Sequence, residues 1–259
     1  MKYSKNNNPN RKIYNTKYSD LNLKLFNDLG NSYVNELINI RLELIQVYGK
    51  GKTVLDLCCG TGEYTLYNPN LFKQVYCIDF STKMLAFFRE RLEGSNAPKV
   101  KLILSDARAI AIKDEAVDFA FSFTSLYHVP DVAFVIKEID RVLRPGGYAV
   151  FELGNTHSIN NLVAEVSHKR LGTAKSFLIP FGKMAKMISL AGLNIIQHRA
   201  FQIMPMWGAG SKLLIPVTHP FWRSLLGVKI RKRMFDEIVS TAWPFRYFAF
   251  RHLFICQKI

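Results

Sequence analysis

Two glycines and three acidic residues give the clearest chemical signal in this sequence. Gly60 and Gly62 stand in the stretch DLCCGTGEYT, where an apolar run meets the start of a helical pattern. Glycines at such a turn allow unusual backbone conformations and let a ligand approach the main chain. Asp56 precedes the turn, and Asp79 and Asp106 each end a later apolar run. Acids in these places suit ribose hydroxyls and an adenine amino group, so the set predicts an adenosine-containing ligand.

The identity of that ligand depends on the loop itself. A nicotinamide-binding loop requires a third small residue, but Thr65 stands where it is needed. Asp56 would repel a pyrophosphate and attract a cation. S-adenosylmethionine combines adenosine with a cationic amino acid end, and it therefore fits these residues better than a dinucleotide does.

The elements that position these residues alternate between strand and helix. Short apolar runs predict strands, and segments with helical spacing lie between them. A doubly wound, mostly parallel α/β sheet follows, and such sheets bind ligands outside the carboxyl ends of their strands. The predicted strands are 53–59, 74–80, 100–106, 116–125, 147–154 and 193–202, and the predicted helices include 19–48, 81–94 with Ser81 as its cap, 131–147, 158–172 and 180–192.

Five segments in order resemble the class I S-adenosylmethionine-dependent methyltransferases. They are VLDLCCGTGEYT, YCIDFSTKML, LSDARAI, VDFAFSFTSLYHVPD and LRPGGYAVFE. The resemblance covers about residues 35–201 together with the closing segment YFAFRHLFICQKI. It implies a Rossmann-like sheet of seven strands whose last strand runs antiparallel, with a helical cap or insertion, and it implies S-adenosylmethionine as the cofactor.

The same resemblance assigns cofactor-binding roles along these segments. Cys58 is a departure, because the family loop commonly reads D-x-G-x-G-x-G and Cys58 replaces its first glycine. We expect a small thiol there to leave cofactor binding intact. The expected cofactor-binding residues are Asp56, Cys58, Gly60, Gly62, Asp79, Phe80, Met84, Asp106, Ala107 and Phe123.

Methyl transfer from a sulfonium needs alignment of the reactants, exclusion of water and sometimes a proton acceptor. His128 in SLYHVPD is the candidate catalytic base; the alternative is a loop histidine that packs under a lid. Tyr127, His157 and Trp207 are the candidate substrate contacts.

The segment after the fourth predicted strand also restricts the acceptor. It lacks the [DN]PP[YFW] motif of nucleobase and amide N-methyltransferases. It also lacks the Arg-Asn-Val segment typical of ubiquinone and menaquinone methyltransferases, although that class shares the DLCCGTG-like loop. LYHVPD is more similar to small-molecule methyltransferases, and we expect methylation of an oxygen on a sugar, a lipid-linked compound or a secondary metabolite.

Charge divides the chain unevenly. The net charge is +15, and the block 25–155 is nearly neutral, whereas the two flanking blocks hold the basic excess. This balance suits an anionic substrate, nucleic acid or an anionic membrane surface, and it equally suits a solvated basic face. A tRNA or other nucleic-acid methyltransferase, which we expect less, and a non-catalytic cofactor-binding protein therefore remain alternatives to the small-molecule enzyme.

The chain divides into four expected parts. Residues 1–34 are a loosely attached basic arm and a cap helix, 35–202 the cofactor-binding core, 203–245 an aromatic and basic insertion that acts as a lid, and 246–259 the last core strand. No secretory signal or apolar run of about 18 residues occurs, so we expect a cytoplasmic protein, with membrane contact through the insertion. The four cysteines have no metal-ligand spacing, and we expect packing roles and no metal site.

Overall fold

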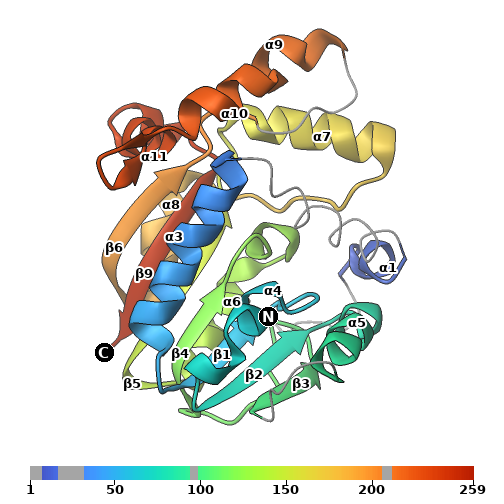
Figure 1. The fold of residues 1–259 in the computed structure, drawn as a ribbon, viewed down its shortest axis with the longest axis vertical. Coiled ribbons are helices and arrows are strands. Elements are labelled where there is room, and N and C mark those ends of the chain that lie inside the picture. The colour runs from blue at the N-terminus through green and yellow to red at the C-terminus, as the bar shows by residue number, and fades with distance from the viewer. Residues whose placement is uncertain (1–7, 17–31, 94–98, 206–211) are drawn as a thin grey trace.

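The computed structural model describes residues 8–16, 32–93, 99–205 and 212–259. Its centre is one seven-stranded sheet in the order β3-β2-β1-β4-β5-β9-β6 (Figure 1). β9 pairs antiparallel with both β5 and β6, and the other strand pairs of this sheet are parallel. The predicted fold class is therefore confirmed. The strands are β1 (Thr53–Leu57), β2 (Gln74–Asp79), β3 (Val100–Leu104), β4 (Val117–Ser122), β5 (Leu143–Gly154), β6 (Leu193–Phe201) and β9 (Arg251–Lys258).

Helices cover both faces of the sheet because strand side chains alternate between two apolar clusters. Leu55 and Leu57 of β1 belong to the cluster that packs under α6 (Val132–Val142) and α8 (Phe181–Leu190). Val54 belongs to the other cluster, under α3 (Ser32–Gly49) and α5 (Thr82–Glu93). Two shorter elements, α4 (Glu63–Tyr67) and η1 (Pro69–Leu71), connect β1 to β2.

Several boundaries differ from the sequence prediction by a few residues, and the clearest case is the junction of α6 and β5. The helix expected over 131–147 ends at Val142, and β5 begins at Leu143 instead of Gly147. Pro145 explains the shortening, because proline cannot continue a helix and disfavours helical geometry in the residue before it. Leu143 is extended and pairs with Val117 of β4.

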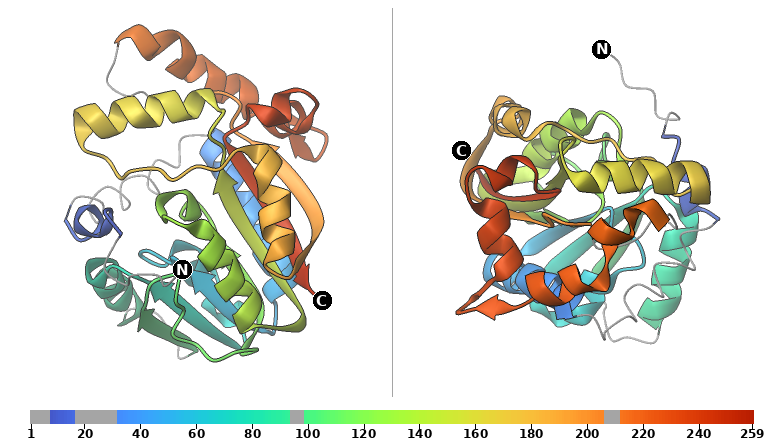
Figure 2. Two further views of the ribbon diagram at one scale, coloured as in Figure 1. Left: turned by 180° about the vertical axis from the view of Figure 1, so that it is seen from behind. Right: turned by 90° about the horizontal axis from the view of Figure 1, so that it is seen from above.

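The segment after β6 forms a set of short elements at one end of the molecule (Figure 2). They are η3 (Lys212–Leu214), α9 (Ile215–Thr218), α10 (Pro220–Leu226), the β7–β8 ribbon (Lys229–Ile230 and Arg233–Met234), α11 (Phe235–Thr241) and η4 (Phe245–Tyr247). α10 packs on α3 and α11 packs on β6. Leu214 and Val217 contact Val163 and Val166 of α7 (Ile159–Leu171). The described part of this segment therefore packs against α3, α7 and β6.

The N-terminal arm is attached more firmly than expected over residues 8–16. Asn10 is 1% exposed, and its Nδ2 donates to the carbonyl oxygens of His128 and Lys175, both at 2.9 Å. Its Oδ1 accepts from the Lys175 N–H at 2.8 Å. The short helix α1 (Arg11–Tyr14) follows and lies beyond the carboxyl ends of β2 and β3 (Figure 1). The rest of the expected arm, 1–7 and 17–31, lies outside the described residues.

Candidate active site

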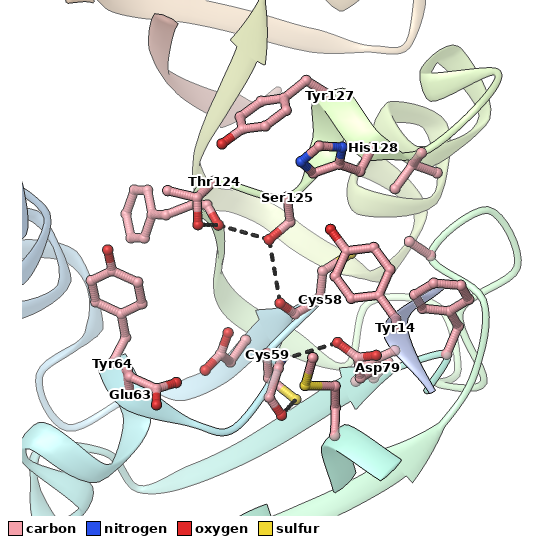
Figure 3. A pocket seen from close by; sticks show the side chains of 18 of the residues that line it. Tyr14, Cys58, Cys59, Glu63, Tyr64, Asp79, Thr124, Ser125, Tyr127 and His128 are labelled. Carbon is pink, nitrogen blue, oxygen red and sulfur yellow. Dashed lines mark hydrogen bonds between the residues drawn. The ribbon is translucent and has the colours of Figure 1, made fainter. Parts of the chain in front are cut away.

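A cavity of about 490 Å³ opens at the carboxyl ends of β1, β2 and β4, between α1, α3 and α7. Figure 3 shows Asp79 and Cys59 on one side of it and Tyr127 and His128 opposite. Nine of the ten predicted cofactor residues line this cavity, and Gly62 does not. The nine are Asp56, Cys58, Gly60, Asp79, Phe80, Met84, Asp106, Ala107 and Phe123.

The loop after β1 owes its shape to three left-handed residues. Cys58, Gly60 and Gly62 have φ values of 59°, 55° and 84°. A Cβ on Gly60 would meet no protein atom within 4 Å, whereas a Cβ on Gly62 would lie 2.3 Å from the ring of Phe88. Gly62 therefore holds the loop against α5, and Gly60 leaves its cavity side open. Cys58 takes a conformation in which only glycine is free of strain, which explains the family's glycine there.

Asp79 connects this loop to the end of β2. Its Oδ2 accepts from the Gly60 N–H at 3.0 Å, and its Oδ1 accepts from the Ser81 N–H at 2.9 Å. Burial raises the pKa of Asp79 to about 6, although these N–H groups favour its carboxylate. Ser81 also caps α5 as predicted, since its Oγ accepts from the Met84 N–H at 3.2 Å.

Asp56 lies beneath the loop and is 4% exposed. Its Oδ2 accepts from the Thr65 hydroxyl at 2.7 Å. Burial raises the pKa of Asp56 to about 7, and the nearby carboxylates of Glu63 and Asp79 raise it further. The cavity therefore holds a carboxyl group whose ionisation a bound cation would favour.

Asp106 is already paired. Its carboxylate accepts from Nε and Nη2 of Arg108 at 3.1 and 3.0 Å, and from the Arg108 N–H at 2.9 Å. From its place in the sequence, Asp106 is expected to accept a hydrogen bond from an adenine amino group. The guanidinium of Arg108 balances the negative charge of the Asp106 carboxylate. Ala107 and Met84, both buried, add apolar side chains to the cavity lining.

His128 follows β4 in the short helix η2 (Leu126–His128) and lines the cavity. Its Nδ1 lies 3.2 Å from the carbonyl oxygen of Lys175. A carbonyl only accepts, so Nδ1 carries the proton and Nε2 has the free lone pair. Burial, the largest cause, lowers the pKa of His128 to about 4, and the charge of Arg251 lowers it as well. His128 is therefore neutral near pH 7, with Nε2 available to accept a proton.

The three predicted substrate residues lie in different places relative to the cavity. Tyr127 lines the cavity next to His128, and their rings are 4.7 Å apart. His157 is exposed and is not among the residues that line the cavity. Trp207 lies outside the described residues. Within the described part of 203–245 no residue lines the cavity either; Ser167 and Leu171 of α7 do so instead.

A polar wall that the sequence analysis missed completes the cavity. Arg41 of α3 donates to Glu152 Oε1 at 2.8 Å and Oε2 at 3.1 Å, and to the Tyr64 hydroxyl at 2.9 Å. Arg251 of β9 donates to Glu152 Oε2 at 3.0 Å. The available signal was a charged residue inside each of two apolar runs, VFELG and FAFRHLF. Arg41 stands in a longer helical pattern with no such signal.

Tyr14 is a second group that the sequence did not reveal. Its ring lies 5.6 Å from the ring of Phe80 and 6.1 Å from that of His128. The neighbouring Asn15 accepts from the Ser81 hydroxyl at 2.6 Å. The arm therefore joins the cofactor side of the cavity to the side that holds His128.

Part of the chain matches known proteins in sequence. Residues 55–151 match the family described as a methyltransferase domain. A demethylmenaquinone methyltransferase of Geobacillus stearothermophilus is 36% identical over 104 residues, which is 39% of this chain and 44% of that protein. The chain thus spans less than half the length of the curated relatives that it matches.

Two solved structures show the likeness of fold. A methyltransferase from Thermotoga maritima, described as a possible histamine N-methyltransferase, has a TM-score of 0.63 at 16% identity and covers 96% of this chain and 99% of its own. The [4+2]-cyclase SpnF has a TM-score of 0.59 at 17% identity, over 86% of this chain and 79% of its own. At such identities these similarities concern the fold alone.

Proposed function

We propose that this chain is a class I S-adenosylmethionine-dependent methyltransferase and transfers a methyl group to a small-molecule acceptor, since its residues 55–151 match a methyltransferase-domain family. This match implies S-adenosylmethionine as the cofactor. One observation carries the proposal: the residues expected to bind the cofactor line a single cavity that continues to Tyr127 and His128. Cofactor and acceptor would then share one water-poor space, as methyl transfer requires.

Each group of cavity residues would have a separate role in binding or in methyl transfer. Asp79 would bind the ribose hydroxyls, and Asp56 would attract the cationic end of the cofactor. Ala107 and Met84 would contact the adenine ring. When bound, the cofactor supplies an electrophilic methyl group. The residues of this chain orient it, exclude water and accept a proton from the acceptor at Nε2 of His128.

We propose an oxygen nucleophile on a sugar, a lipid-linked compound or a secondary metabolite. A second acceptor class is a quinone-type ring, because the matched curated relatives are demethylmenaquinone methyltransferases. The absence of the Arg-Asn-Val segment favours the first class. The apolar side chains of Val34, Leu37 and Ile38 on the cavity wall suit a ring in either class.

The proposal includes peripheral contact with an anionic membrane from the cytoplasm. Among the described residues no helix is long and apolar enough to span a bilayer. Leu213 is 87% and Phe221 57% exposed, and the segment 212–232 that carries them holds basic but no acidic residues. Apolar side chains among basic ones suit an anionic lipid surface. Sedimentation with phosphatidylglycerol vesicles should remove the protein from the supernatant, whereas sedimentation with phosphatidylcholine vesicles should leave it there.

The experiment that tests the proposed activity supplies S-adenosylmethionine carrying a labelled methyl group. Incubation with a metabolite extract should move the label into a small molecule, with release of S-adenosylhomocysteine. Label found in RNA would favour the nucleic-acid alternative. Cofactor binding without transfer to any acceptor would favour a non-methylating protein, an outcome that this fold allows because the [4+2]-cyclase SpnF shares it.

A further inference from the structure

Two guanidinium groups line the cavity in addition to its acidic residues. Arg41 and Arg251 both line it, although their side chains are only 5% and 6% exposed. They come from α3 and β9, which lie far apart in the sequence and meet over β5. Glu152 of β5 pairs with both arginines, is 1% exposed and is not among the lining residues. The cavity therefore meets the cations, and the shared carboxylate lies behind them.

One carboxylate balances only one of these two charges. Asp236 accepts hydrogen bonds from Tyr33, Ser240 and the backbone of Gln202 and lies outside the cavity lining. Glu63 does line the cavity, but it pairs with Arg91. A buried charge that is not fully balanced by an opposite charge is unfavourable. The wall therefore retains an attraction for one further negative charge, and the open side from which that charge can come is the cavity.

The cavity is thus bipolar. Asp56 and Asp79 lie at the loops after β1 and β2, and the two arginines line the wall formed by α3 and β9. Hydroxyl groups of Tyr64 and Tyr127 stand beside the arginines; the Tyr64 hydroxyl accepts from Arg41, and the ring of Tyr127 lies 5.3 Å from the Arg251 guanidinium. An arginine side chain surrounded by aromatic rings and hydroxyls recognises a planar anion well.

We propose that this basic wall, Arg41 with Arg251, binds an anionic oxygen group of the acceptor, namely a carboxylate or an ionised ring hydroxyl. The inference rests on the proposed function, since it concerns the acceptor half of the same cavity. It also gives the acceptor a feature that the acid-lined half would reject. Of the acceptors considered above, those with an acidic group are therefore selected.

A second source of the same chemistry is the carboxylate of the cofactor itself. The test separates the two sources by using the full chain saturated with S-adenosylhomocysteine. Benzoate and its neutral analogue benzamide are then titrated by calorimetry at constant ionic strength. Wild-type protein should bind benzoate at least about tenfold more tightly than benzamide, which is the usual effect of one charge-assisted pair.

Variants assign that preference to the wall. Arg251→Gln should remove most of it, and Arg251→Lys should retain part of it, while both bind S-adenosylhomocysteine within about threefold of wild type. Arg199→Gln is the matched control. Arg199 is on β6 of the same sheet as Arg251, it pairs with Glu237 of α11, and it is not among the residues that line the cavity. The wild-type comparison decides the question even if Arg251→Gln does not fold.

Equal binding of benzoate and benzamide to the wild-type complex would overturn the inference. It would also be overturned if Arg251→Gln weakened S-adenosylhomocysteine binding tenfold but left 5′-methylthioadenosine, which lacks the carboxylate, unchanged. In that case the wall would hold the cofactor. Failure of the wild type to bind S-adenosylhomocysteine at all would instead refute the proposed function.

Discussion

The backbone N–H of Gly60 donates to Oδ2 of Asp79 across 3.0 Å, and this bond joins the loop after β1 to the end of β2. The other oxygen, Oδ1, accepts from the Ser81 N–H. Asp79 thereby fixes the glycine loop and still lines the cavity. A cofactor bound there would contact a loop that is already in place, which lowers the entropy cost of binding.

Replacing Cys58 with glycine should stabilise the fold. Cys58 has a φ of 59°, and a left-handed conformation costs a non-glycine residue about 1–2 kcal/mol. Glycine removes that strain, but it lowers the free energy of unfolding by about 0.5–1 kcal/mol because a glycine loses more backbone entropy on folding. We expect Cys58→Gly to raise the free energy of unfolding by about 0.5–1 kcal/mol in urea denaturation. Cys59→Gly, at a buried neighbour outside the left-handed region, should lower it; a less stable Cys58→Gly variant would contradict this account.

Alanine at the two loop glycines should have different effects. At Gly62 the new methyl group would lie 2.3 Å from the Phe88 ring, so Gly62→Ala should lower the melting temperature strongly. At Gly60 it would meet only open space, so Gly60→Ala should lose about 1 kcal/mol of stability to backbone strain and weaken cofactor binding further. Thermal denaturation with and without S-adenosylhomocysteine separates these effects. Equal melting temperatures for the two variants would disagree with the packing described here.

Affinity for S-adenosylmethionine should rise with pH. The pKa of Asp56 is raised to about 7 and that of Asp79 to about 6, so both are largely protonated at pH 5.5. A cationic ligand favours the carboxylates, and calorimetry should find about tenfold tighter binding at pH 8 than at pH 6. Asp56→Asn should remove most of this pH dependence of the affinity. A profile in the variant as steep as in the wild type would exclude Asp56 as its source.

The same group has the opposite effect on the ligand-free fold. Since the pKa of Asp56 is raised above its unfolded value of about 3.9, its favourable contribution is present below that pH and is lost as the pH rises to about 7. The free energy of unfolding of wild type relative to Asp56→Asn should therefore fall between about pH 4 and pH 7.

His128→Asn should reduce kcat by about 10²- to 10⁴-fold and leave cofactor affinity unchanged, because the imidazole contacts the acceptor side. Its pKa of about 4 keeps His128 neutral, so kcat at saturating cofactor should show no histidine titration between pH 6 and pH 8. His157→Asn is the control, since His157 is exposed and does not line the cavity. Full activity in His128→Asn, or an equal loss in the control, would remove the base assignment.

Sequence reasoning found the residues whose position follows from strand order. Asp56 and Asp79 end adjacent parallel strands, and parallel strands bring their carboxyl ends to one edge. The last strand was also predicted correctly, because β9 reads as an apolar run and takes its antiparallel place between β5 and β6.

The acceptor side was less predictable because it depends on contacts between distant segments. Arg41 and Arg251 are 210 positions apart in numbering, and both pair with Glu152. The side-chain amide of Asn10 joins the arm to the backbone of Lys175 by hydrogen bonds that no local sequence pattern predicts. The insertion was expected to be a lid because of its aromatic and basic composition, but composition does not say which face an element packs against. Its described residues pack on α3, α7 and β6.

The most direct test of the account is calorimetric titration of the full chain with S-adenosylmethionine, in wild type and in Asp79→Ala. We expect one equivalent to bind to the wild type and at least about tenfold weaker binding in the variant, which loses both a ribose acceptor and the partner of the Gly60 N–H. Asp114→Ala, at an exposed acid outside the cavity lining, should bind like wild type. No binding by the wild type, or unchanged binding in Asp79→Ala, would contradict the assignment of this cavity to S-adenosylmethionine.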